Sequence, residues 1–269
     1  MSTGGPVNTG GPVSTGGLVS TGGLVNTHRV LATSRRVLRQ LRHDPRTVAL
    51  MLVVPCVLMV LLRYVFDGHL PVFDRVAPML LAILPFTVMF VVTSVAMLRE
   101  RTSGTLERLL TTPMAKSDLL AGYAVAFGVV AVIQVGVVAA VTLGPLGVRS
   151  AGGTGVLLLV GVLDALLGTA LGLFLSVFAH SEFEAVQFMP AFVLPQLVLC
   201  GLFAPRDQMA PVLRWLSDVL PLSYAVDGAS RAASSPGWSA SLIVDLVVVG
   251  ACIPVALGLG ALTLRRRTP

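Results

Sequence analysis

The sequence predicts an all-α membrane protein with six transmembrane helices, and three observations support this fold class. Hydrophobic residues make up 55% of the 269 residues, only 12% are charged, and the mean hydropathy is +0.87. Soluble domains carry about 25% charged residues, so this composition leaves too little polar surface for a protein dissolved in water. Six apolar stretches each approach the ~20 residues that a helix needs to cross a bilayer. The basic residues flank these stretches instead of forming a polar domain.

Residues 1–27 are expected to form a disordered tail in front of a transmembrane domain at residues 28–269. The tail repeats a hexamer, STGGPV or a close variant, without a charged residue. A segment rich in Gly, Ser and Thr buries little apolar surface and stays flexible. A hexapeptide β-helix is the alternative, but the few short copies lack the bulk to form a core.

The segment from His28 to Arg46 is predicted to be an amphipathic helix at the membrane interface. Arginines alternate with apolar residues at helical spacing, which places a basic face toward lipid headgroups. His43, Asp44 and Pro45 end this helix ahead of the first span, because proline cannot continue the hydrogen-bond ladder.

The predicted spans cover residues 47–66, 77–98, 118–143, 155–178, 187–204 and 240–264. The fifth span is short and contains Pro190 and Pro195. Membrane helices tolerate proline where neighbouring groups satisfy the freed carbonyls. A broken or re-entrant helix is therefore the alternative to a straight fifth span.

The distribution of basic residues predicts that both termini are cytoplasmic. One side of the predicted topology collects Arg29, Arg35, Arg36, Arg39, Arg42, Arg46, Arg99, Arg101, Arg108, Lys116, Arg265, Arg266 and Arg267. The other side carries Arg75, Arg149, Arg206, Arg214 and Arg231, and Arg63 lies near it. Loops rich in Lys and Arg stay in the cytoplasm. The pI near 10.0 thus reflects membrane orientation, and no nucleic-acid partner is expected.

No catalytic residue and no metal ligand is predicted. A P-loop needs Lys after Gly, but the only lysine, Lys116, follows Ala115. His180-Ser181-Glu182 resembles the start of a zinc-deaminase motif without its cysteines and is interpreted as a polar turn. The three cysteines fall inside apolar stretches and are interpreted as small hydrophobic residues; they are Cys56, Cys200 and Cys252.

The second loop is expected to contain a two-turn cytoplasmic helix. Ser103 or Gly104 can cap it, and Glu107 in its first turn favours the helix dipole. Apolar residues at i, i+3 and i+4 form one face: Leu106, Leu109 and Leu110. Thr112 precedes Pro113 and is biased away from helical geometry, so the helix ends there.

Three separated motifs resemble the type-2 ABC exporter permease family, including its daunorubicin-resistance members. The loop ERTSGTLERLLTTP at residues 100–113 resembles the family motif E-R-x-x-G-T-L-E-x-L-x-x-T-P. Residues 201–228, with GLFAP, MAP and LPLSYAVDG, resemble the extracellular segment before the last span. The basic helix that ends at Arg46 resembles the N-terminal interfacial helix. Gly122-Tyr123 departs from the Gly-Lys of many members.

The resemblance implies a permease subunit for the ATP-driven export of a lipophilic substrate, such as a drug, an antibiotic or a lipid-like molecule. It implies a separate ABC ATPase partner that binds ATP and Mg, with no cofactor on this chain. It also implies a second permease copy, identical or paired, and a bacterial plasma (inner) membrane location. A cytoplasmic coupling helix would dock on the ATPase through Gly104, Thr105, Leu106, Glu107, Leu109, Leu110 and Pro113.

Polar residues inside spans are further candidates for the pathway or for helix packing: Gln134, Asp164, Gln196 and Asp245. An aspartate at a helix centre costs about 2.5–3.5 kcal/mol on the insertion scale. Asp164 is expected either to pair with Arg63 or to hold a proton or drug cation. Helix-to-helix hydrogen bonding is the favoured role for Asp164. Gly168 and Gly172 in the same span permit close helix approach.

Rival functions come from other classes. A proton-coupled secondary transporter would use Asp164 and Asp245 as carriers. A membrane scaffold would leave the coupling motif unexplained, and an intramembrane enzyme lacks a recognisable set of nucleophile and base.

Overall fold

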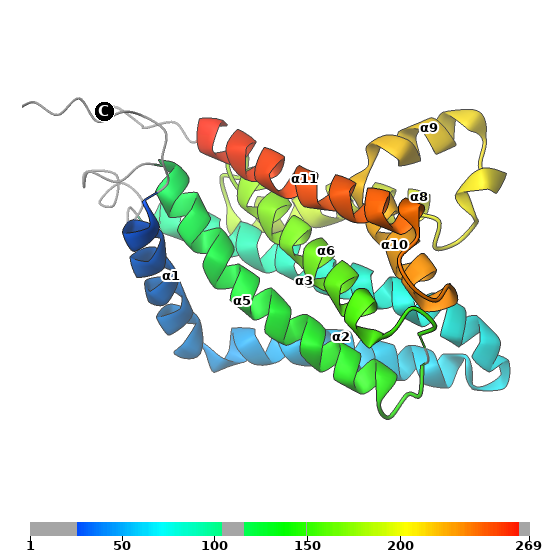
Figure 1. Ribbon diagram of the computed structural model, residues 1–269. Helices are drawn as coiled ribbons and strands as arrows, with labels where there is room; N and C mark the ends of the chain where they lie inside the picture. Colours follow the sequence, from blue (N-terminus) through cyan, green and yellow to red (C-terminus); the bar gives the residue numbers. More distant parts are fainter. Residues whose placement is uncertain (1–25, 104–115, 149, 264–269) are drawn as a thin grey trace, which may run out of the picture.

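The computed structural model describes residues 26–103, 116–148 and 150–263, and all regular structure in these ranges is helical. This confirms the all-α fold class. Within these ranges, five helices are long and apolar enough to cross a membrane. They are α2 (Pro45–Val65), α3 (Leu70–Thr102), α5 (Lys116–Leu143), α6 (Thr154–Leu175) and α11 (Ala240–Thr263). Figure 1 shows them side by side in one elongated bundle.

Shorter helices lie at the two ends of the bundle or between the spans. They are α1 (Thr27–Arg42), η1 (Asp67–His69), α7 (Glu182–Phe188), η2 (Met189–Val193), α8 (Leu194–Leu199), η3 (Arg206–Gln208), α9 (Pro211–Val219) and α10 (Pro221–Ser234). One end carries α1, and the opposite end carries α9 (Figure 1). We call these the α1 end and the α9 end.

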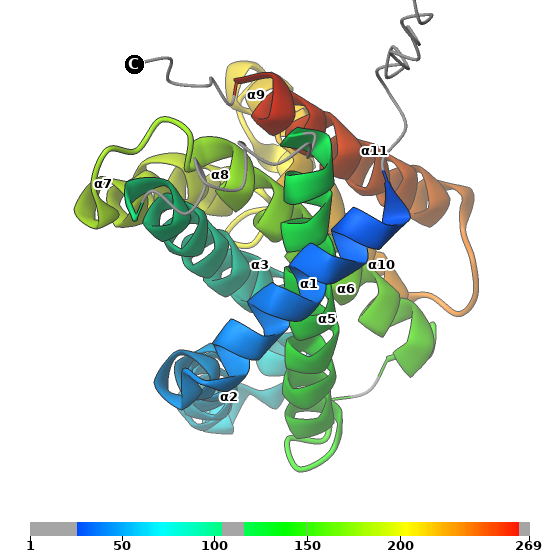
Figure 2. The ribbon, with the colours of Figure 1, turned by 90° about the vertical axis from the view of Figure 1, so that its left-hand side faces the viewer.

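The amphipathic segment forms α1, which lies across the end of α5 (Figure 2). Its buried face packs against α5 at Gly122, where an added Cβ would lie only 2.5 Å from the Cβ of Thr33. The Asn26 side chain caps the first turn of α1, and the Asn26 amide donates a hydrogen bond to Asp118 on α5 (3.0 Å). The helix ends at Arg42, and Asp44 then caps α2 by accepting from the amide of Thr47 (3.2 Å).

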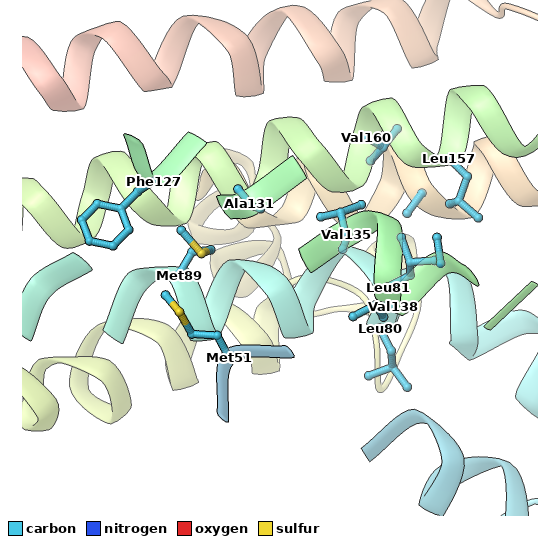
Figure 3. Close-up of a cluster of buried hydrophobic side chains, with 14 of the residues drawn as sticks. Met51, Leu80, Leu81, Met89, Phe127, Ala131, Val135, Val138, Leu157 and Val160 are labelled. Carbon is cyan, nitrogen blue, oxygen red and sulfur yellow. The ribbon is translucent and has the colours of Figure 1, made fainter. Parts of the chain in front are cut away.

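A core of apolar side chains joins α2, α3, α5 and α6. Figure 3 shows part of it, with Met51 from α2, Met89 from α3, Phe127 from α5 and Val160 from α6. The chain therefore holds its spans together by interdigitated packing as well as by polar contacts.

Two glycines bring α6 against the backbone of α3, as the sequence predicts. A Cβ on Gly168 would lie 2.4 Å from the carbonyl oxygen of Phe86, and one on Gly172 would lie 2.4 Å from that of Phe90. The hydroxyl of Thr93 also donates to the carbonyl of Thr169 across this contact (3.3 Å). Only glycine permits such a close approach, because any other residue would force the two backbones apart.

The stretch predicted as the fifth span, residues 187–204, is helical only as far as Leu199 and contains a π-helical turn. The chain passes from α7 through the π-helical turn η2 into α8, which ends at Leu199. Pro190 lies in η2 and Pro195 in the first turn of α8. Each proline lacks the amide that a regular α-helix would use, and the α-helical hydrogen bonding gives way to a π-helical turn here. The chain stays helical from Glu182 to Leu199, so the helix is distorted but does not break.

The α3–α6 contact predicts that Gly172→Ala destabilises the protein by about 1–3 kcal/mol, because the new methyl group would overlap the carbonyl of Phe90. Thermal unfolding in mild detergent measures the effect. Gly136→Ala on α5 is the matched control, since no atom lies within 4 Å of its added Cβ. Equal melting temperatures for the two variants would contradict this packing.

Candidate functional site at the end of α3

The last turn of α3 connects to the helices around it through three consecutive charged residues. Arg99 forms a two-pronged ion pair with Glu182 at the start of α7, with Nε–Oε1 and Nη2–Oε2 distances of 2.9 and 3.1 Å. This planar pairing fixes the geometry of the contact, but both side chains are more than half exposed, so it adds only about 0–1 kcal/mol to stability. The hydrogen bonds from Arg99 also lower the pKa of Glu182, so the carboxylate stays ionised.

Glu100 points to the other side of α3, toward α1. Its carboxylate lies 3.5 Å from Arg36 Nη2 and accepts from Gln40 (3.4 Å), both on α1. The Arg36 guanidinium also donates to the buried hydroxyl of Tyr123 on α5 (2.9 Å). One arginine of α1 thus joins α3 and α5. Tyr123, which accepts this hydrogen bond, occupies the position of the lysine in the Gly-Lys pair of many family members.

Arg101 completes the set by donating to the carbonyl of Ser176, the residue that caps the C-terminus of α6. Arg99, Glu100 and Arg101 therefore reach α7, α1 and α6 in turn, and we call them, with these partners, the α3 junction. A shift in the last turn of α3 therefore changes contacts to all three helices, two of them ion pairs and one a hydrogen bond to a carbonyl.

The predicted coupling helix follows the α3 junction directly in the chain. Gly104, Thr105, Leu106, Glu107, Leu109, Leu110 and Pro113 lie outside the described residues. The structure describes the chain on both sides of them, up to Ser103 and again from Lys116, where α5 begins.

Gln134 forms a hydrogen bond between two helices. Its Nε2 donates to the carbonyl of Met51 on α2 (2.9 Å), and its side chain is fully buried. In a regular helix the amide of residue 55 would bond this carbonyl, but residue 55 is proline. Gln134 therefore supplies the donor that Pro55 removes.

Asp164 does not form the expected pair with Arg63. The Arg63 guanidinium bonds Asp67 (3.1 Å) and lies over the ring of Phe73 at the α9 end. Asp164 is fully buried, and neither of its carboxyl oxygens has a hydrogen-bond partner. The pairing fails because α6 buries Asp164 among apolar side chains, while Arg63 has a partner one helical turn away.

Gln196 and Asp245 lie elsewhere in the fold. The Gln196 amide donates within its own helical segment, to the carbonyl of Phe192 (3.3 Å). Asp245 lies near the start of α11 and forms an ion pair with Arg231 of α10. The four polar residues from the spans are therefore not assembled into one site.

Sequence reasoning missed a chain of alternating charges at the α9 end. Arg206 pairs with Asp218 of α9 and with Asp227 of α10. Asp227 lies 3.8 Å from Arg231, which holds Asp245. The network ties η3, α9, α10 and α11 together. Its only sequence signal is the presence of arginines and aspartates in one predominantly apolar region, which does not reveal the pairs.

Within residues 26–103, 116–148 and 150–263, the structure holds no group of three His, Cys, Asp or Glu residues that could bind a metal ion. Cys56, Cys200 and Cys252 are free thiols in buried or half-buried positions.

Comparison with known proteins gives one family. The sequence model of the ABC-2 type transporter family matches residues 28–232. The probable multidrug ABC transporter permease YbhS of Escherichia coli (strain K12) is 25% identical over 178 residues, which cover 66% of this chain and 47% of the relative. The linearmycin resistance permease protein LnrN of Bacillus subtilis (strain 168) is 24% identical over 184 residues, which cover 66% and 48%.

A eukaryotic protein also matches. ABC transporter G family member 20 of Dictyostelium discoideum is 25% identical over 152 residues, which cover 56% of this chain and 21% of the relative. The chain thus spans between about a fifth and a half of the length of these relatives.

The contact between Gln134 and Met51 predicts that Gln134→Leu lowers stability by about 0.6–1.7 kcal/mol, the range for hydrogen bonds between membrane helices. The loss should shrink in a Pro55→Ala background, because the substituted alanine offers its own amide to the Met51 carbonyl. Thermal unfolding of the wild type, both single variants and the double variant measures the coupling free energy between positions 134 and 55. If the effects of the two substitutions on stability are additive, Gln134 does not stand in for the amide that Pro55 lacks.

Proposed function

Because the chain belongs to the ABC-2 type transporter family, we propose that it is the membrane-spanning permease of an ABC exporter whose ATP is hydrolysed by a separate ATPase subunit. The family match over residues 28–232 carries this proposal, and the five candidate spans agree with it. ATP and Mg bind the partner subunit, and this chain forms the pathway.

The proposed substrate is a lipophilic molecule, such as a drug, an antibiotic or a lipid-like compound. Two relatives are named for multidrug transport and for linearmycin resistance. The apolar surfaces of the spans suit a substrate that partitions into the bilayer before export.

The proposed topology places the α1 end in the cytoplasm of a bacterial inner membrane, with both termini on that side. The α1 end carries most of the described basic residues, including Arg29, Arg39, Arg42 and Arg46. Loops rich in arginine remain cytoplasmic. In this arrangement α1 lies in the interface, and the helical segment α7–η2–α8, with its π-helical turn, provides the sixth membrane element. A second permease copy, identical or paired, completes the transporter.

The proposed mechanism runs through the α3 junction. Residues Gly104 to Leu110 form a coupling helix that docks on the ATPase through Leu106, Leu109 and Leu110. The segment connects directly to the last turn of α3, whose charged residues contact α1, α6 and α7. A displacement imposed by the ATPase is thereby passed to several helices at once. The two-pronged pair of Arg99 and Glu182 and the contacts of Glu100 and Arg101 give this turn a defined orientation against its neighbours.

The rival proton-coupled transporter has one observation in its favour, which is the unpartnered carboxyl of Asp164. Its second carrier, Asp245, is already paired with Arg231. The proton route therefore lacks a continuous pair of free carboxyl groups, and we favour the ATP-driven exporter.

Leu109→Asp should abolish the association with the ATPase while membrane insertion survives, because a charge on the apolar docking face must be desolvated. A mild-detergent pull-down from the native host, read by mass spectrometry for a chain with a P-loop, measures association. Thr111→Asp is the matched control, since helical spacing places residue 111 on the opposite face.

Recovery of the same ATPase with Leu109→Asp as with the wild type would reject the docking helix. The absence of any P-loop chain from a wild-type pull-down that preserves other membrane complexes would reject the exporter itself.

A further inference from the structure

A cavity of about 500 Å³ lies at the α1 end, between α1, the start of α2, α3 and α5. Its volume falls within the range of about 300–1,000 Å³ that is typical of small-molecule sites. Neither the family match nor the interpretation of the sequence assigns a role to this space. It borders the α3 junction, because Arg99 and Glu100 both line it.

The wall that α3 contributes changes from apolar to polar along the helix axis. Val91, Val95 and Ala96 line its inner part, and Arg99, Glu100 and Ser103 line the part nearest the α1 end. These positions recur at intervals of about four residues, so they share one face of the helix. At 1.5 Å per residue, the wall from residue 91 to residue 103 is about 18 Å long. A ligand that follows this wall needs an apolar body and a polar head.

The charges at the polar end favour a cationic head. The carboxylates of Asp44 and Glu100 both line the cavity. Glu100 already contacts Arg36 and Gln40 of α1, so the cationic preference rests mainly on Asp44. The nearby Arg99 guanidinium is already engaged by both oxygens of Glu182. Hydrogen bonds from Thr47 lower the pKa of Asp44, which keeps this carboxylate ionised, and no cation of the described residues forms an ion pair with it. An anionic head would meet this carboxylate without a free cation to balance it.

We propose that this cavity binds a small cationic amphiphile, with its amine head between Asp44 and Glu100 and its apolar body along Val91, Val95 and Ala96. The proposal rests on the proposed export function and names the substrate class and entry site. The ligand enters from the cytoplasmic leaflet, whose headgroup and hydrocarbon levels match the polar and apolar ends of the wall. Its head then contacts Glu100, which joins α3 to α1, so occupancy is sensed at the α3 junction.

Photo-crosslinking tests the site directly. The full chain, purified with its co-purifying subunits, is placed in phosphatidylcholine nanodiscs with dodecylamine that carries a diazirine in its tail. Dodecanoic acid with the same diazirine tail is the matched probe of opposite charge. Mass spectrometry maps the labelled residues. The amine should label α3 between residues 91 and 103 at low concentration, and the acid should label this segment at least tenfold less.

Two variants separate the roles of charge and volume. Asp44→Asn keeps a cap for α2, because Asn caps helices as well as Asp does, but removes the charge; it should weaken amine labelling about tenfold. Ala96→Phe fills the cavity and should abolish the labelling. Ala251→Phe is its matched control, because Ala251 is exposed on α11 and remote from the cavity; it should leave the labelling unchanged.

Equal labelling by amine and acid, or labelling that Ala96→Phe does not reduce, would overturn the proposal. Loss of the amine label when phosphatidylethanolamine is added to the nanodiscs would also overturn it, by assigning the cavity to a bilayer lipid. Recovery of the ATPase in the same preparations is scored separately, so a failure of the ligand site is distinguishable from a failure of the export function.

Discussion

The close packing of α3 against α6 is the contact on which the remaining arrangement depends. At Gly168 and Gly172 the backbones of the two helices approach so closely that no space remains for a Cβ atom. The contact fixes the direction of α3, the longest helix in the part of the chain that the structure describes. Because α3 is fixed, its last turn projects from the bundle at a set position, where Arg99, Glu100 and Arg101 meet α7, α1 and α6.

The bilayer imposes a second constraint, since its core offers no water to polar groups. The chain meets it by pairing polar groups between helices. Gln134 bonds the carbonyl that Pro55 leaves free, and Arg231 pairs with Asp245 at the start of α11. Charged pairs concentrate at the two ends of the bundle, where the cost of burial is smaller. Some buried polar atoms in the described part of the chain still lack a partner, and Asp164 is the carboxyl group among them. Apolar packing therefore stabilises the middle of the bundle, and networks of charged residues stabilise its two ends.

Sequence patterns predicted the elements whose signal is local. The amphipathic spacing of α1, the apolar runs of the five long helices and the small residues of α6 each lie within a single segment. The prolines in 187–204 raised the alternative of a broken helix, whereas the chain stays helical from Glu182 to Leu199 through a π-helical turn. The sequence could not choose between these forms, because neighbouring helices decide whether a freed carbonyl finds a donor. The coupling motif at 104–113 lies outside the described residues, and its role stays a prediction.

Pairs that join distant segments could not be foreseen from one sequence. Arg99 and Glu182 are 83 residues apart, and nothing in either local pattern selects the other over the many remaining charges. The sequence suggested an ion pair between Arg63 and Asp164 across the bundle. In the structure, Arg63 instead bonds Asp67, which is only four residues away in the chain. Partner choice of this kind follows from the three-dimensional crossing of helices, which composition and periodicity do not encode.

The central claim is that the charged contacts of the α3 junction transmit motion between the ATPase and the membrane helices. A charge exchange tests it most directly, by measuring substrate-stimulated ATP hydrolysis in the assembled complex for Arg99→Glu, Glu182→Arg and the double variant. We expect each single reversal to lower the stimulation severalfold, because like charges then face each other, and the exchange to restore most of it. Full stimulation in the single variants, with the complex intact, would contradict the claim.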